Sequence, residues 1–187
     1  METKKKRQMV CPVQMAGLLD NRLRRLIQNP KKLLEPYIQD GMTILDVGCG
    51  PGFFSIEMAK MLTHTGKVIA ADLQEGMLDI VKRKILGTEL EARIELHKCA
   101  EDKIGISEKV DFVIAFYMVH EVSNQESLFR ELKSILKPNG KIYIIEPKFH
   151  VSKNSFEKMK DKTTELGFQI AETPKFVFSR AVVLTIN

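Results

Sequence analysis

The chain has 187 residues, of which 44% are hydrophobic and 28% are charged, and its formal net charge is +5. This length indicates one domain that can bury a core without the help of disulfides or metals. No stretch approaches the roughly 20 apolar residues that a membrane-spanning helix needs, and no signal-peptide pattern follows the start. Cys11, Cys49 and Cys99 are odd in number and lack metal-ligand spacing. We therefore expect a cytoplasmic protein with reduced thiols, without a metal site and without membrane association.

The N-terminal part differs in character from the rest. Residues 1–12 are rich in lysine and predict a basic, flexible tip, although such a run could also contact nucleic acid or an anionic membrane. From Met15 to Ile27 apolar residues recur at helical spacing, and Asn29-Pro30 predicts the start of a second helix that runs to about Ile38. We expect residues 13–40 to form a helical cap, which either packs on the domain or covers a pocket as a lid.

From residue 41 onward, predicted strands and helices alternate. Short apolar or alternating runs predict strands, and apolar residues three and four positions apart predict helices. The predicted strands are Thr43–Val47, Lys67–Ala71, Arg93–His97, Val110–Phe116 and Ile142–Ile145, and the predicted helices are Phe53–Leu62, Gly76–Leu86, one capped by Ser123 and Glu126, and one around Phe156–Leu166. Lys137–Gly140 predicts a turn before the fifth strand.

Two further strands close the sequence. Phe168–Phe178, interrupted near Pro174, and Ala181–Ile186 are separated by two residues and predict an antiparallel hairpin. The whole pattern predicts an α/β fold over residues 41–187: a doubly wound, mostly parallel seven-stranded sheet with helices on both faces and an antiparallel C-terminal hairpin. Ligands of such sheets bind at the carboxyl ends of the strands, where the winding direction reverses beside the first strand.

The loop after the first predicted strand is rich in glycine. Asp46 is followed by Gly48, Gly50 and Gly52, and alternate glycines let a ligand approach the main chain closely, although they could also form only a tight turn. The spacing is GxGxG, which differs from the GxGxxG of dinucleotide folds, and no P-loop lysine follows. The carboxylate of Asp46 would repel a pyrophosphate but attract an ammonium group. Asp72, at the end of the second strand, is placed to accept hydrogen bonds from ribose hydroxyls.

These residues resemble one family closely. Ile44–Gly52 is similar to the first motif of class I S-adenosylmethionine-dependent methyltransferases, and Asp72 matches the acidic residue after that family's second strand. Cys99-Ala100-Glu101 resembles the adenine-binding segment, with cysteine where aspartate is usual. Asp111–Val122 and Leu136–Ile145 resemble the motifs of the fourth and fifth strands. The resemblance implies a Rossmann-like domain that binds S-adenosyl-L-methionine and transfers its methyl group.

The resemblance also implies roles for single residues. The glycines would accommodate the methionine part of the cofactor near Asp46, and Asp72 would hold the ribose. Leu73 and Met77 would lie beside the adenine, and Phe116 would line the methyl-donor side. The implied cofactor-binding residues are Asp46, Gly48, Cys49, Gly50, Gly52, Asp72, Leu73, Met77, Ala100, Glu101 and Phe116.

Two histidines are the candidates for catalysis. His120 follows the fourth strand and His150 follows the fifth, so both loops are expected to open toward one crevice. We predict that both histidines line the acceptor pocket and that one serves as general base, the alternative being ordinary surface or helix-capping histidines. A further hypothesis has His120, Glu121 and His150 hold a metal ion.

The acceptor is less constrained than the donor. Related methyltransferases that act on planar amine groups carry an Asn/Asp-Pro-Pro-Tyr/Phe motif after the fourth strand. The corresponding segment Ala115–Met118 lacks this motif, which disfavours such acceptors. We expect a small-molecule acceptor. One alternative is an RNA or protein acceptor, which the basic tip and Arg22, Arg24 and Arg25 would favour. Another is a module that binds the cofactor without turnover. A nicotinamide oxidoreductase is the least favoured alternative because of the glycine spacing. The sequence does not indicate an oligomeric state.

Overall fold

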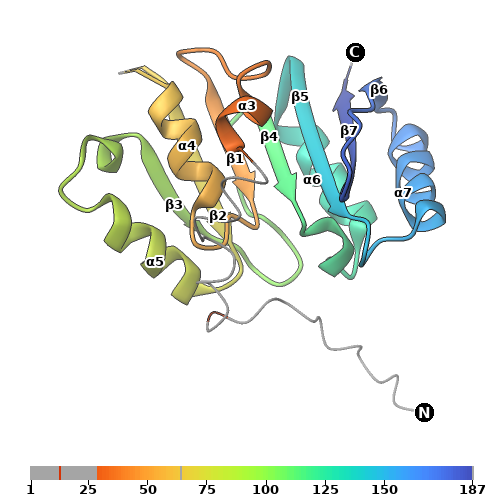
Figure 1. Cartoon of the computed structure of the whole chain (residues 1–187), viewed down its shortest axis with the longest axis horizontal. Coiled ribbons are helices and arrows are strands. Elements are labelled where there is room, and N and C mark those ends of the chain that lie inside the picture. Colours follow the sequence, from red (N-terminus) through yellow and green to blue (C-terminus); the bar gives the residue numbers. More distant parts are fainter. Residues whose placement is uncertain (1–12, 14–28, 64, 187) are drawn as a thin grey trace.

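The computed structural model describes Val13, residues 29–63 and residues 65–186, and these form one layered α/β unit around a central sheet (Figure 1). The predicted N-terminal tip, the stripe from Met15 to Ile27 and Cys11 lie outside the described residues. The elements in chain order are α3 Pro30–Leu34, β1 Thr43–Val47, α4 Phe53–Met61, β2 Lys67–Asp72, α5 Glu75–Ile85, η2 Glu89–Ala92, β3 Ile94–Lys98, β4 Val110–Phe116, η3 Val119–Glu121, α6 Gln125–Ile135, β5 Leu136–Pro147, α7 Lys153–Glu165, β6 Gln169–Glu172 and β7 Ser179–Thr185.

The sheet confirms the predicted fold class. Its seven strands have the order β3-β2-β1-β4-β5-β7-β6, in which β1 to β5 pair in parallel and β7 pairs antiparallel with both β5 and β6. The chain runs outward from β1 to β3 and then returns to the other side of β1 with β4. The winding direction therefore reverses between β1 and β4, as predicted, and a crevice is expected at the carboxyl ends of these two strands.

Helices cover both faces because the strands are apolar on both faces. Ile44 packs with the helices α3, α4 and α5, whereas its neighbour Leu45 packs with α6 and α7. Successive side chains of a strand point to opposite faces, so one continuous apolar run can serve two cores. This explains why the bounds predicted for β1 and β4, Thr43–Val47 and Val110–Phe116, agree with the structure.

The prediction was wrong about the ends of several elements. Helix α6 takes its N-cap from Asn124, whose side chain accepts a hydrogen bond from the Ser127 amide, and not from Ser123. The Lys137–Gly140 segment, predicted as a turn before the strand, lies within β5 as an irregularity. There the partner of Val110 is Leu136, but the partner of Phe112 is Lys141. Asn139 takes a φ of 64° in this bulged stretch, which asparagine tolerates better than most residues.

The C-terminal hairpin is confirmed with a longer connection than expected. Strand β6 ends at Glu172, and residues 173–178 lead to β7, which begins at Ser179. The two residues predicted as the turn, Ser179 and Arg180, therefore belong to β7. Helix α3 ends at Leu34 rather than near Ile38, because Pro36 cannot continue the helical hydrogen bonding. In the part of the chain that is described, no helix is long and apolar enough to cross a membrane.

Phe129 provides a test of the core under α6. Its side chain is 0% exposed and packs edge-on against Phe168, with ring centroids 6.3 Å apart. We expect Phe129→Ala to lower the free energy of unfolding by about 3–5 kcal/mol, measured by urea denaturation followed by circular dichroism, because it leaves a cavity. Phe129→Leu, the control that keeps more of the side-chain volume, leaves a smaller cavity and should cost clearly less than Phe129→Ala. Equal and small effects for both variants would contradict this packing.

Candidate functional site

The glycine loop is bound to the end of β2. Gly48 and Cys49 both donate their backbone N–H to the Ala71 carbonyl, at 2.8 and 3.0 Å, and Gly50 donates to Asp72 Oδ2 at 2.8 Å. Gly48, Gly50 and Gly52 take φ values of 69°, 53° and 82°, which residues with a side chain rarely adopt. The positive φ angles of the glycines thus turn the amides of Gly48, Cys49 and Gly50 toward the end of β2.

The three glycines of this loop differ in the space around them. A Cβ atom on Gly48 would lie 3.0 Å from Met118, and one on Gly52 would lie 3.0 Å from Val81. A Cβ on Gly50 would have no atom within 4 Å. Gly48 and Gly52 are therefore required by packing as well as by backbone angle. Gly50 borders open space beside Asp72, which is where a ligand could approach the main chain.

Asp72 is the buried acid of this region. Its side chain is 6% exposed, Oδ2 accepts from Gly50 and Oδ1 accepts from the Gln74 amide at 2.8 Å. Burial raises the pKa of the Asp72 carboxyl, and the two backbone N–H groups act in the opposite direction. Each carboxylate oxygen has a second lone pair, so Asp72 can accept further hydrogen bonds from a ligand with hydroxyl groups.

Asp46 lies on β1, beneath α4. It is 2% exposed, and the Ser55 hydroxyl donates a hydrogen bond to Asp46 Oδ2 at 2.5 Å. Two carboxylates, Asp46 and Asp72, therefore flank the glycine loop. These two acceptor groups suit a cationic ligand that carries hydroxyl groups, and they would repel a pyrophosphate.

The remaining predicted cofactor residues divide into those near the surface and those that are buried. Leu73 is half-buried, and Ala100 and Glu101 are exposed directly after β3, where the Cys99 amide donates to the Asp72 carbonyl at 2.9 Å. Met77 is 1% exposed. Leu73, Ala100 and Glu101 therefore share the end of β2 and β3 with Asp72, whereas Met77 supports that region from the interior.

The two described cysteines are packed thiols. Cys49 is 6% exposed, and burial raises its pKa well above the usual value. Burial also raises the pKa of Cys99 to about 12, with a smaller contribution from the nearby Asp72 charge. A thiol must ionise to act as a nucleophile, so neither cysteine is suited to covalent chemistry near neutral pH.

Aromatic rings follow the end of β4. Phe116 is 8% exposed and stacks on Tyr117, with ring centroids 4.0 Å apart. Tyr117 has a φ of 58°, which is unusual for a residue with a side chain, and its hydroxyl lies 2.6 Å from Ser179 Oγ on β7. Phe149, which is 73% exposed, meets Tyr117 edge-on at 6.4 Å. These rings form an apolar wall between the ends of β4 and β5.

The structure brings the two predicted histidines together. The rings of His120 and His150 lie nearly parallel with centroids 5.6 Å apart. His120 Nδ1 is hydrogen-bonded to Glu146 Oε2, and Glu146 Oε1 accepts from the Val119 amide at 2.9 Å. Glu146 is 2% exposed, and its hydrogen bond raises the pKa of His120. His150 is exposed, and its amide donates to the Pro147 carbonyl.

The structure gives no support to the hypothesis of a metal held by His120, Glu121 and His150. Within residues 29–63 and 65–186 no group of three or more His, Cys, Asp or Glu side chains could hold a metal ion.

Sequence reasoning missed three residues of this region. Ser55, Glu146 and Ser179 bind Asp46, His120 and Tyr117 respectively. Glu146 directly follows the predicted fifth strand Ile142–Ile145, but nothing in the local sequence pairs it with His120. Its partner is 26 residues away, and strand register, not local sequence, brings them together.

Comparisons with known proteins agree with this geometry. The family model described as "Methyltransferase domain" matches residues 38–180. A demethylmenaquinone methyltransferase of Oceanobacillus iheyensis is 32% identical over 109 residues, which cover 58% of this chain and 46% of that protein. A ribosomal protein L11 methyltransferase of Dictyoglomus turgidum is 28% identical over 141 residues, 75% of this chain and 43% of that protein. The chain thus spans about half the length of the curated relatives it matches.

A solved structure matches over nearly the whole chain. The crystal structure of a SAM-dependent methyltransferase from Aquifex aeolicus has a TM-score of 0.85 and 27% identity, and the match covers 95% of this chain and 100% of that one. The fold, the glycine loop with its two acids and the family match agree, and the chain belongs to the methyltransferase domain family, with the class I fold of S-adenosylmethionine-dependent methyltransferases.

Proposed function

We propose that this chain transfers the methyl group of S-adenosyl-L-methionine to a small-molecule acceptor. The observation that carries the proposal is the open space at Gly50 beside the buried, hydrogen-bonded carboxylate of Asp72. Acids on both sides of the loop fit a cofactor that is cationic at its amino and sulfonium groups and carries a ribose. We further propose a cytoplasmic location, which the free thiols of Cys49 and Cys99 support.

In this proposal the backbone of the glycine loop holds the methionine part of the cofactor, with Asp46 near its amino group. Asp72 uses its remaining lone pairs for the ribose hydroxyls. Leu73 packs against the adenine, with the buried Met77 behind it. Cys49 contributes its backbone, since its thiol is buried in the core.

The exposed segment after β3 would complete the adenine side. Ala100 lies at the rim, and Glu101 is able to accept a hydrogen bond from an amino group. Phe116, at the end of β4, would line the methyl-donor side through its contact with Tyr117. The departure from the family pattern at Cys99 leaves one carboxylate fewer in this segment, so Glu101 and the main chain carry its polar contacts.

The chemistry is an in-line displacement, for which S-adenosylmethionine supplies an electrophilic methyl group. The chain's own residues orient the acceptor and exclude water, which can provide a large part of the acceleration. The rings of Phe149, Tyr117 and His150 are placed to hold an apolar or planar acceptor. The exposed face of Phe149 makes an apolar small molecule a suitable partner for this wall.

His120 is the proposed general base. An ionised carboxylate only accepts hydrogen bonds, so Nδ1 of His120 is the donor to Glu146, and Nε2 is left to accept a proton from the acceptor. Glu146 fixes the tautomer and stabilises the imidazolium that forms. His150, stacked on His120, is proposed to line the acceptor pocket.

Relatives support a small-molecule acceptor and leave one alternative. Several curated relatives, from different bacteria, are demethylmenaquinone methyltransferases, at 28–33% identity. The match to a ribosomal protein L11 methyltransferase covers more of this chain, so a protein acceptor is the second candidate. An extract incubated with the purified protein and a methyl donor carrying an isotopic label separates them by mass spectrometry. Label in small molecules supports the proposal, and label confined to protein or RNA contradicts it.

Gly50→Ala tests the cofactor loop. The new Cβ projects into the open space and forces a residue with a side chain to a φ of 53°. We expect the free energy of unfolding to fall by about 1–2 kcal/mol and the affinity for S-adenosylhomocysteine, measured by calorimetry, to fall at least about tenfold. Gly87→Ala is the matched control, because Gly87 has a φ of 72° and equally open surroundings, and it follows α5 outside the glycine loop. Unchanged affinity in Gly50→Ala would place the cofactor elsewhere.

The Glu146–His120 pair predicts a specific titration. The ring of His120 should titrate above pH 6.5, because the Glu146 carboxylate favours its protonated form. In Glu146→Gln this support is removed, so the pKa of His120 should fall, as followed by NMR of the imidazole protons against pH. Glu121→Gln, which removes a more weakly acting charge, should shift it less. An unchanged His120 titration in Glu146→Gln would refute the pairing.

Turnover of the identified acceptor should separate the two histidines. A general base contributes about 10²–10⁴-fold, so His120→Gln should lower kcat by about a hundredfold or more, with S-adenosylhomocysteine affinity unchanged. His150→Gln should lower kcat less than about tenfold and mainly raise KM, since it removes a wall of the pocket. Full turnover in His120→Gln would show that the acceptor reacts without this base.

A further inference from the structure

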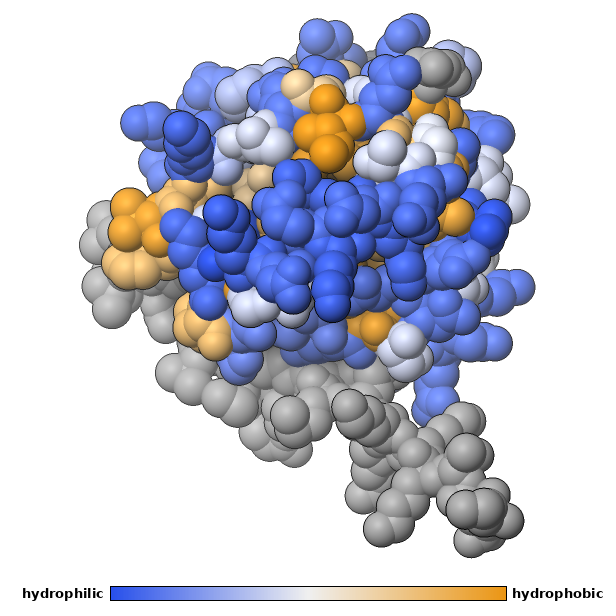
Figure 2. All heavy atoms as spheres, turned by 90° about the vertical axis from the view of Figure 1, so that its right-hand side faces the viewer, coloured by the Kyte–Doolittle hydropathy of each residue, from blue (hydrophilic) through white to orange (hydrophobic). Residues whose placement is uncertain are grey.

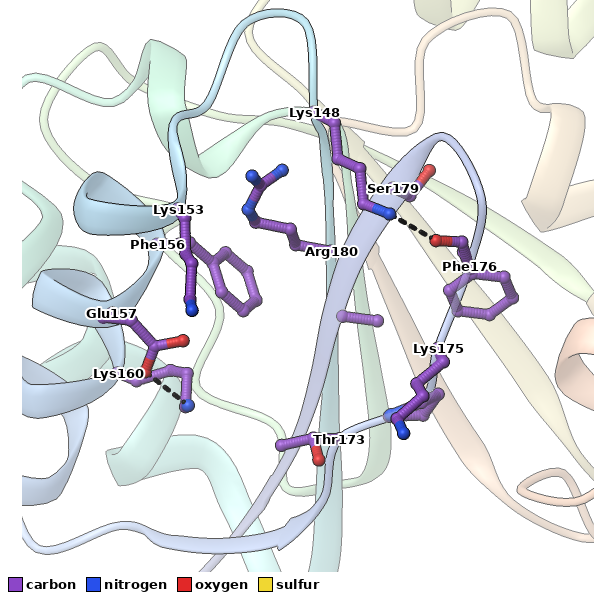
Figure 3. Close-up of a pocket in the computed structure, with 12 residues that line it drawn as sticks. Lys148, Lys153, Phe156, Glu157, Lys160, Thr173, Lys175, Phe176, Ser179 and Arg180 are labelled. Carbon is purple, nitrogen blue, oxygen red and sulfur yellow. Dashed lines mark hydrogen bonds and ion pairs between the residues drawn. The ribbon is translucent and has the colours of Figure 1, made fainter.

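A cavity lies apart from the glycine loop, between α7 and the connection from β6 to β7 (Figure 3). Its volume is about 580 Å³, within the range of small-molecule sites. Most of its charged lining residues are basic: Lys148, Lys153, Lys160, Lys175 and Arg180. Glu157 is the one acidic side chain among the described residues that line it. We call this cavity the basic groove.

The groove arises from the way β6 and β7 part. β6 pairs with β7 only as far as Glu172, and beyond it the chain meets β7 through a bridge between Lys175 and Arg180. The edge of β7 near its start is therefore left open toward α7. Figure 2 views the side of the molecule that carries α7 and β6, where hydrophilic residues dominate the surface. The basic groove is thus bounded by α7 on one side and by the β6–β7 connection and the start of β7 on the other.

Most of the positive charge of the groove is not neutralised within it. Lys160 pairs with Glu157 at 2.7 Å. Lys148 donates to the Phe176 and Val177 carbonyls at 2.6 and 2.8 Å, which positions its ammonium group but leaves its charge in place. Charges of one sign in a recess with low-dielectric walls raise the local concentration of the opposite ion.

Arg180 is the strongest indication that the groove binds an anion. Its Nη1 atom is buried and has no hydrogen-bond partner among the residues that the structure describes. Figure 3 shows the side chain extending from β7 toward α7 into the groove. A buried donor without a partner is costly, and a ligand oxygen would remove that cost. The planar guanidinium matches the geometry of phosphate oxygens better than a lysine does.

We propose that the basic groove binds a phosphate group of a small molecule, with Arg180 as its central contact. Lys148 and Lys153 lie on either side of the Arg180 head group, and Phe156 on α7 provides an apolar wall for the remainder of the ligand. The limited volume of about 580 Å³ favours a compact phosphorylated molecule over a polymer.

The groove is chemically opposite to the cofactor loop, and its ligand is independent of the proposed methyl transfer. Carboxylates flank the glycine loop, and cations line the groove. The groove meets the aromatic wall after β4 at Ser179, which lines the groove and whose Oγ is 2.6 Å from the Tyr117 hydroxyl. A phosphorylated molecule in the groove would therefore lie near the aromatic wall that contains Tyr117.

Calorimetry with pyrophosphate at constant ionic strength tests the proposal on the whole chain. We expect measurable binding to the native protein and a loss of about ten- to a hundredfold in affinity in Arg180→Gln. Lys158→Gln is the matched control, because Lys158 is exposed on α7 and does not line the groove. Glu157→Gln removes the opposing charge and should tighten binding, a gain that a poorly folded variant could not show.

S-adenosylhomocysteine and a short single-stranded RNA serve as further ligands in the same test. S-adenosylhomocysteine should bind native protein and Arg180→Gln alike, which keeps failure of the groove distinct from failure of the cofactor site. Absence of pyrophosphate binding at millimolar concentration, or equal affinity in Arg180→Gln and Lys158→Gln, would overturn it. Binding of a short single-stranded RNA that depends on Arg180, without pyrophosphate binding, would also overturn it and assign the groove to nucleic acid.

Discussion

The carboxylate of Asp72 connects the parts of the cofactor side. One oxygen accepts the amide of Gly50 from the loop after β1, and the other accepts the amide of Gln74 at the start of α5. A buried carboxylate is tolerated only when its oxygens are hydrogen-bonded, so these two amides are a condition of its burial. In return, the acceptors at the end of β2 hold the glycine loop in its positive-φ conformation. The parallel register of β1 and β2, with Val47 opposite Ala71, brings the two ends together.

A second buried acid organises the acceptor side in the same way. Glu146, near the end of β5, binds the amide of Val119 with one oxygen and the ring of His120 with the other. The short turn η3, which comes before β5 in the chain, is thereby fixed to the end of that strand. Both acids lie at carboxyl ends of parallel strands, where amides of the following segments point toward the crevice. Rigid strands thus carry the side chains that the loops need, which is a general way to position a site.

Much of the fold could be predicted from the sequence, because its strands are continuous apolar runs. The bounds of β1 and β4 were correct since both strands are buried on both faces. The prediction failed where chain conformation depends on a partner. Lys137–Gly140 carries turn residues, but pairing with β4 makes it a bulge inside β5. Arg180 was assigned to a turn, and only the length of the β6–β7 connection places it on β7 facing the groove.

The candidate site divides along the same line. The glycine loop and Asp72 are local patterns with fixed spacing, and the sequence contains them in full. The partners of the histidines are not local: 26 residues separate His120 from Glu146, and 62 separate Tyr117 from Ser179. Single polar residues such as Ser55 and Ser179 carry no periodic signal that would mark them. The proposed cofactor loop is therefore readable from sequence, and the proposed acceptor side becomes readable only with strand order and register.

The glycine loop and the basic groove differ in the sign of their charge. Acids gather at the ends of β1 and β2, and bases gather at the end of β5 and the start of β7. A cationic donor and an anionic molecule would thus be drawn to opposite sides, with the aromatic wall of Tyr117 and Phe149 between them. Such a separation limits competition between the two ligands, because each side repels the charge that the other attracts. The neutral wall between them is the place where an uncharged reacting group could meet the methyl donor.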